Sequence, residues 1–114
     1  MSSFDISYDE EEDVLEVTFG EPDEAVTRTL PLNDNILIHS EITLQNLWGL
    51  SFFSYSKLLG VSETEFTSIS ALTQAQQDLV IRLLSTEPGS LFFDVTYPDA
   101  LIARIKTPNL RSLI

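Results

Sequence analysis

Cysteine is missing from this chain, and several other residues on which common sites depend are scarce. The absence of cysteine excludes a disulfide framework, a thiolate nucleophile and any zinc site built on sulfur ligands. The 114 residues include only one histidine, His39, and four widely separated glycines. The sequence therefore contains neither an H-E-x-x-H metal motif nor a glycine-rich loop that cradles phosphate, and it predicts no cofactor.

Basic residues are also few. Six lysines and arginines stand against 18 acids, which gives a formal charge of −12 and an isoelectric point near 4.1. Ten of the acids precede the first basic residue, Arg28. Nucleic acids and anionic membranes are bound by basic surfaces that displace counterions from phosphate, so we expect the chain to bind neither unaided. A basic protein remains a partner that this charge favours.

Long apolar runs are absent as well. No stretch reaches the ~18 apolar residues of a membrane span, and the segment from Met1 to Asp5 has no secretory signal pattern. We therefore expect a cytoplasmic protein. The composition, with 43% hydrophobic and 10% aromatic residues, is sufficient to bury the core of one domain.

Alternation of apolar and polar residues, the period of a half-buried strand, recurs through the first half of the chain. Turn residues such as Gly20-Glu21-Pro22-Asp23 and Asn33-Asp34-Asn35 separate the alternating segments. This pattern predicts an antiparallel meander of about five strands, at residues 4–8, 15–19, 26–30, 36–38 and 47–53.

An amphipathic helix is expected in the second half, where it would cover the apolar face of the sheet. Thr73 stands three residues before Gln76, as in a capping box, and apolar residues then recur at helical spacing until Pro88-Gly89. A short helix is expected at residues 55–59, and the polar segment 62–70 is predicted to be a connecting loop.

A C-terminal β-hairpin is expected over residues 91–106, because apolar residues alternate on both sides of the turn at Pro98-Asp99. Adjacent aromatics, Phe92 and Phe93, would place a ring on each face of its first strand. One of these faces would meet another element or another subunit, so Phe92, Phe93 and Tyr97 are predicted interaction residues.

These elements together predict an α+β fold in a single domain, residues 1–114. The sheet would occupy residues 4–60, and the helix and hairpin would follow in residues 61–114.

Five consecutive acids, Asp9 to Asp13, interrupt the first predicted hairpin. We expect Asp9 to cap a tight turn by accepting backbone N–H groups while the other acids face water and discourage aggregation. Alternatively, Asp9, Glu11 and Asp13 could be oxygen ligands of a divalent cation. A calcium loop that began at Asp9 would have Val14 where glycine is needed and Gly20 where glutamate is needed. A docking surface is the third possibility.

A family resemblance begins in this acidic run. Its motif is Tyr8-Asp9-x-Glu11-x-Asp13-x-Leu15-x-Val17, followed by Gly49-Leu50-x-Phe52 and then Ser56-Lys57. Over residues 4–60 the chain resembles the prokaryotic family of domains of unknown function catalogued as number 2283. Glu16 and the segment 42–45 depart from the family pattern. The resemblance implies a small antiparallel sheet, no established activity, and an antitoxin-like or other partner-binding role.

His39 is the only histidine that could act as a base beside a serine, while paired carboxylates for glycoside hydrolysis remain an open alternative. Nucleophilic serine catalysis needs such a base beside the serine, and no G-x-S-x-G elbow accompanies the serines. We expect His39 to be a strand residue whose ring nitrogens are satisfied by neighbours or water. The sequence therefore predicts that the protein is not an enzyme.

Two functional hypotheses follow from these observations. The first is a non-enzymatic acidic module that binds a basic protein or forms a homodimer. Self-association would use exposed sheet edges or aromatics, and the hairpin at residues 91–105 is the first candidate. The second is a divalent-metal-binding domain that uses Asp9, Glu11 and Asp13 and serves a hydrolase.

Overall fold

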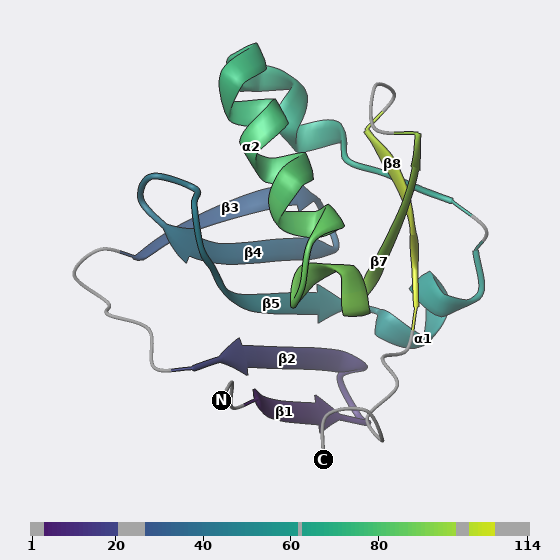
Figure 1. Ribbon diagram of the computed structural model, residues 1–114. Coiled ribbons are helices and arrows are strands. Elements are labelled where there is room, and N and C mark those ends of the chain that lie inside the picture. Colours follow the sequence, from purple (N-terminus) through teal and green to yellow (C-terminus); the bar gives the residue numbers. More distant parts are fainter. Residues whose placement is uncertain (1–3, 21–26, 62, 98–100, 107–114) are drawn as a thin grey trace.

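The computed structural model describes residues 4–20, 27–61, 63–97 and 101–106 (Figure 1). The elements follow in the order β1 (Phe4–Asp9), β2 (Val14–Phe19), β3 (Thr27–Asn33), β4 (Ile36–Glu41), β5 (Leu47–Phe53), α1 (Tyr55–Leu59), β6 (Thr64–Glu65), η2 (Thr67–Ala71), α2 (Gln74–Ser85), η3 (Gly89–Leu91), β7 (Phe93–Tyr97) and β8 (Ile102–Ile105). The α+β class is confirmed, with a five-stranded antiparallel sheet, one main helix and a C-terminal hairpin.

The order of strands in the large sheet differs from that of a meander. It is β1-β2-β5-β4-β3, so β5 returns to pair with β2 in a Greek-key arrangement. The central position suits β5 because Leu47 and the four consecutive residues from Gly49 to Phe52 are buried. Leu50 and Phe52 face the core, while the small residues Gly49 and Ser51 lie on the opposite face. Alternation along the chain predicts strands but does not say which of them are neighbours.

The second sheet has three strands in the order β6-β8-β7, and it confirms the predicted C-terminal hairpin. The predicted short helix at residues 55–59 is also confirmed, as α1. Residue 62 of the predicted loop 62–70 lies outside the described residues, and residues 63–70 are not a simple loop, because they contain β6 and most of η2. Phe66 and Ile69 anchor this segment in the core, where each side chain is almost completely buried.

Helix α2 begins with the predicted capping box. The Thr73 hydroxyl accepts the backbone N–H of Gln76, and the Gln76 side chain accepts the backbone N–H of Thr73. The helix ends at Ser85, before Pro88, and buries Val80, Leu83 and Leu84. Of the helices in the described ranges, none is long and apolar enough to cross a membrane.

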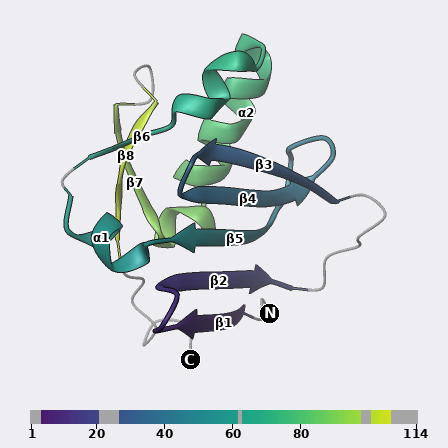
Figure 2. The same cartoon turned by 180° about the vertical axis from the view of Figure 1, so that it is seen from behind.

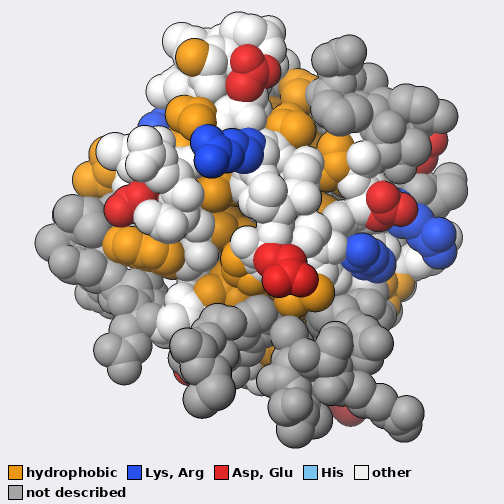
Figure 3. All heavy atoms as spheres, in the orientation of Figure 1, with side chains coloured by type: hydrophobic (Ala, Val, Ile, Leu, Met, Phe, Trp, Pro, Cys, Tyr) orange, Lys and Arg blue, Asp and Glu red, His pale blue; other side chains and the backbone are white. Residues whose placement is uncertain are grey.

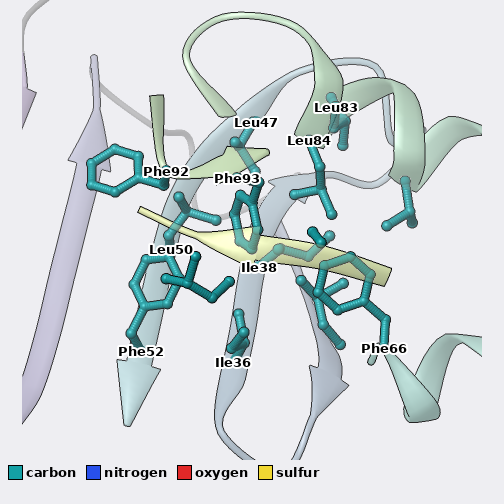
Figure 4. Packing of buried hydrophobic residues seen from close by; sticks show 14 of the residues in the cluster. Ile36, Ile38, Leu47, Leu50, Phe52, Phe66, Leu83, Leu84, Phe92 and Phe93 are labelled. Carbon is teal, nitrogen blue, oxygen red and sulfur yellow. The ribbon is translucent and has the colours of Figure 1, made fainter. Parts of the chain in front are cut away.

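A single hydrophobic cluster joins the two sheets and α2 (Figure 4), and Phe52 of β5 makes three ring contacts within it. Its ring centroid is 5.4 Å from that of Tyr55, 6.0 Å from that of Phe92 and 5.5 Å from that of Phe93. Aromatic rings at such separations stabilise a core beyond the area that they bury. The hairpin is therefore part of the same core as the large sheet.

The prediction that Phe92 and Phe93 form an interaction surface is wrong. Both are buried within the chain, at 0% and 1% exposure. The strand β7 begins at Phe93, whereas Phe92 is the C-cap residue of η3 and has a helical backbone conformation. The alternation of strand side chains therefore does not apply to this pair, and both rings reach the core. The side chain of Tyr97 lies outside the described part of the chain.

Gly49 provides a test of the packing between β2, β5 and β4. A Cβ atom at Gly49 would lie 2.9 Å from the Val17 carbonyl oxygen and 3.2 Å from the His39 ring. We expect Gly49→Ala to lower the free energy of unfolding by about 1–3 kcal/mol, the usual cost of overpacking. Gly60→Ala is the matched control, since a Cβ there makes an ordinary 3.4 Å contact. Urea unfolding that gave both variants the same stability would contradict the prediction.

Candidate functional site

The large sheet has one covered and one uncovered face. Helix α2 and β7 lie over one side (Figure 1), and no described element lies over the other (Figure 2). Strand alternation and pairing register identify the outward positions. These positions are Asp5, Ser7, Asp9, Val14, Glu16, Thr18, Thr27, Thr29, Pro31, Leu37, His39, Glu41, Gly49, Ser51 and Phe53.

The charge on this outward face has one sign at neutral pH. Its strand positions include the acids Asp5, Asp9 and Glu16, and none of these described positions carries lysine or arginine. On the side that carries α2, in contrast, basic and acidic side chains are interspersed with hydrophobic ones (Figure 3). The uncovered face of the sheet therefore differs in charge from the surface of the molecule on the α2 side.

A shallow hollow of about 360 Å³ lies on the uncovered face, over the end of β2 that follows the acidic turn. Val14 and Phe53, which are partners across the β2–β5 ladder, supply apolar surface, and Phe53 is 37% exposed. The acidic residues Asp9, Glu12 and Glu16 line the same hollow, together with Ser7. Such a combination suits a lysine or arginine side chain, whose stem is apolar and whose tip is cationic.

Asp9 forms the turn that the sequence predicts. Its Oδ1 accepts the backbone N–H of Glu11 at 3.0 Å and that of Glu12 at 3.2 Å. Both bonds are local, so the turn depends on a side chain that competes for nearby backbone donors. The side chains of Glu10, Glu11 and Glu12 are exposed to solvent.

Asp13 fastens the first hairpin to α1. One carboxylate oxygen accepts the Tyr8 hydroxyl at 2.6 Å, and the other accepts the Ser56 hydroxyl at 2.6 Å. The carboxylate also accepts the Ser56 backbone N–H at 3.0 Å, while the Asp13 carbonyl accepts the Tyr55 N–H at 3.0 Å. Ser54, the N-cap residue of α1, makes no side-chain cap, so Asp13 satisfies these helix donors from a distant segment.

The electrostatics of this Tyr8–Asp13–Ser56 network follow from its hydrogen bonds. Donation from Ser56, and then from Tyr8, lowers the pKa of the Asp13 carboxyl because it stabilises the charged form. The hydrogen bond between Tyr8 and Asp13 also raises the pKa of the Tyr8 hydroxyl. Sequence reasoning placed Asp13 among solvated acids or metal ligands and missed this role. The signal was present in the resemblance motif, which includes Tyr8, Asp13 and Ser56.

The three predicted metal ligands are not brought together as a metal site. In the described ranges, no three side chains among His, Cys, Asp and Glu are grouped so that they could hold a metal ion. Asp9 and Asp13 instead accept hydrogen bonds within the turn and from α1. The two acids therefore have structural roles, and Glu11 is exposed beside them.

His39 connects three neighbouring strands on the uncovered face. Its Nδ1 lies 2.9 Å from the Thr29 hydroxyl, and its Nε2 lies 3.0 Å from the Ser51 hydroxyl. The prediction that neighbours satisfy this ring is confirmed. Burial lowers the pKa of His39, and the nearby Glu16 carboxylate partly offsets that effect.

The contact between Ser51 and His39 resembles a nucleophile beside its base, but two features favour a structural role. A catalytic triad has a carboxylate behind the histidine to stabilise the imidazolium, whereas Thr29 supplies a neutral hydroxyl. Ser51 is also only 6% exposed, which hinders the approach of a substrate. The row of Thr29, His39 and Ser51 therefore serves to satisfy polar groups across the sheet.

Comparison with protein-family models, with curated proteins and with solved structures gives no match for this chain. The resemblance of residues 4–60 to family number 2283 thus stays a prediction from the motif.

The Tyr8–Asp13–Ser56 network predicts coupling between residues 43 positions apart. Asp13→Asn and Ser56→Ala should each lower the thermal midpoint, and the double variant should lose less than the sum of the two single losses. Asparagine is chosen because Asp13 has a φ of 55°, a backbone conformation that asparagine tolerates. Asp34→Asn, at an exposed turn acid, is the control. Strictly additive losses would show that the two side chains do not interact.

A pH dependence follows from the lowered pKa of His39. Below its ordinary value of 6.5, the unfolded chain binds a proton that the folded chain excludes. The contribution of His39 to the free energy of unfolding is therefore present above pH 6.5 and is lost as the pH falls. We expect the stability difference between the native chain and His39→Gln to shrink on acidification, in urea unfolding at several pH values. An NMR titration that placed the ring pKa at or above 6.5 would contradict this.

Proposed function

We propose that this chain is a non-enzymatic module that binds a basic protein on the uncovered, acidic face of its large sheet. The observation that carries the proposal is the hollow that acidic and apolar residues line together. Asp9, Glu12 and Glu16 are the acidic residues, and Val14 and Phe53 supply the apolar surface. No described element covers this face (Figure 2).

Charge supports a basic partner in two ways. The formal charge of −12 attracts a cationic protein over several ångströms and so raises the rate of encounter. Single exposed ion pairs contribute only about 0–1 kcal/mol each, so several of them and the apolar contact with Phe53 must act together. Because exposed charges are screened by salt, the binding should weaken as the ionic strength rises.

An antitoxin-like pairing with a basic protein, which the family resemblance implies, is one form of this function. The cytoplasmic location expected from the sequence is part of the same proposal. The homodimer expected from the sequence stays a prediction. Phe92 and Phe93 lie in the chain's own core, so of the two interfaces expected for it, exposed sheet edges and aromatics, the sheet edges remain. Light scattering at low and high salt would measure it directly.

The test is affinity capture from native cells, followed by identification of the captured protein and measurement of its dissociation constant. The face variant carries Glu12→Gln and Glu16→Gln, and the control variant carries Glu63→Gln and Glu65→Gln. Each removes two negative charges from exposed positions. We expect a basic partner whose affinity for the face variant is about fivefold weaker, while the control binds like the native chain.

Two outcomes would contradict the proposal. One is a partner that binds the face variant and the native chain equally well at low salt. The other is the absence of any reproducible basic partner in captures made at low ionic strength.

A further inference from the structure

Strand β1 forms one edge of the large sheet. It pairs along its six residues, Phe4–Asp9, with β2, and no described strand pairs with its other side (Figures 1 and 2). An edge strand presents backbone N–H and C=O groups that have no partner within the sheet. Such an edge can receive an extended segment of another chain.

The opposite edge of the sheet, β3, is protected against strand addition. Pro31 lacks a backbone N–H, and the register shifts between Pro31 and Asn33. The segment η2 packs against β3, and the Asn33 side chain donates to the Glu65 carbonyl at 3.0 Å. Of the two edges, β1 is thus the one that is regular and has no proline.

The two faces of β1 differ in chemistry. On the core side, Ile6 and Tyr8 lie opposite Val17 and Leu15, yet they remain 38% and 44% exposed. Tyr8 is held in place by its bond to Asp13 and by the ring of Tyr55, 6.3 Å away between centroids. The core side of β1 therefore presents Ile6 and Tyr8 as exposed apolar surface.

The other side of β1 is acidic. Asp5 and Asp9 are the outward positions at the two ends of the strand, with Ser7 between them. Glu16, the partner of Ser7 on β2, adds a third carboxylate to the same face. A strand that pairs with β1 therefore lies beside carboxylates on one face of the sheet and beside exposed apolar side chains on the other.

We propose that β1 accepts an extended segment of a basic protein as a sixth strand of the sheet. In this segment, lysine or arginine alternates with apolar residues, so that the basic side chains face Asp5 and Asp9 while the apolar ones cover Ile6 and Tyr8. The inference rests on the proposed function, because it states which part of the basic partner binds and where. Backbone pairing supplies affinity in this mode, and the alternating side chains supply specificity.

Charge also decides against a second copy of this chain as the occupant. Pairing of β1 with β1 of another copy would bring two sets of Asp5 and Asp9, with their acidic turns, side by side. Like charges opposite each other on paired strands are destabilising, and each copy carries a formal charge of −12. The acids that discourage self-association leave the edge open to a basic strand.

The experiment uses the full chain, labelled with ¹⁵N, and a blocked six-residue peptide in which lysine and valine alternate. We expect slowed hydrogen exchange and shifted amide resonances within Phe4–Asp9, lost at high salt. A peptide of the same composition with its three lysines grouped should give a response at least about threefold weaker, because it cannot match both faces of β1.

Variants on each face of β1 test the two contacts separately. Asp5→Asn and Ile6→Thr should each weaken binding of the alternating peptide by about two- to fivefold. Their matched controls are Asp34→Asn and Ile42→Thr, at exposed positions in other turns of the sheet. These controls should bind like the native chain.

Three results would overturn the inference. The first is equal binding of both peptides. The second is a response confined to Glu16, Phe53 and their neighbours with unchanged exchange in β1, which would leave the proposed binding on the acidic face intact. The third is slow exchange at the free edge of β1 before peptide is added. Dependence of that protection on protein concentration would identify a second copy, and independence would identify a segment of the same chain.

Discussion

The pairing of β2 with β5 is the interaction on which the rest of the structure depends. It joins the first hairpin to the β3–β4–β5 unit and aligns Leu15 with Phe52. The same register places Glu16 beside Ser51 and Val14 beside Phe53 on the opposite face. Because a slip by one residue would exchange the two faces of β2, a single register determines both the hydrophobic core and the acidic hollow.

The acidic run is divided between structure and surface. Asp9 holds the turn, and Asp13 satisfies the first N–H groups of α1, which directly follows β5. The chain thus fastens the end of the β2–β5 pair with one of its own acids. Glu12 lines the hollow together with Asp9 and with Glu16, which lies just beyond the run. The five adjacent acids therefore do not all have the same role.

Local patterns predicted most elements well, because the forces that determine them act between near neighbours. The capping box at Thr73 and the alternation in the strands are examples, and the turn at Asp9 is another. Predictions failed where contact with a distant segment determines the local structure or the burial of a residue. The segment 63–70 became β6 and most of η2 because β8 and β3 lie beside it, and Phe92 is buried because η3 turns it toward the core.

The sequence by itself determined the strong negative charge, the absence of cysteine chemistry, the α+β class and the positions of the strands and the main helix. Only the tertiary structure decided which strands are neighbours, and hence which acids share a face and which edge is open. It also joined Tyr8 and Asp13 to Ser56, and placed His39 between Thr29 and Ser51. The reason is that such contacts depend on register and packing between distant segments, which the local period of a sequence does not encode.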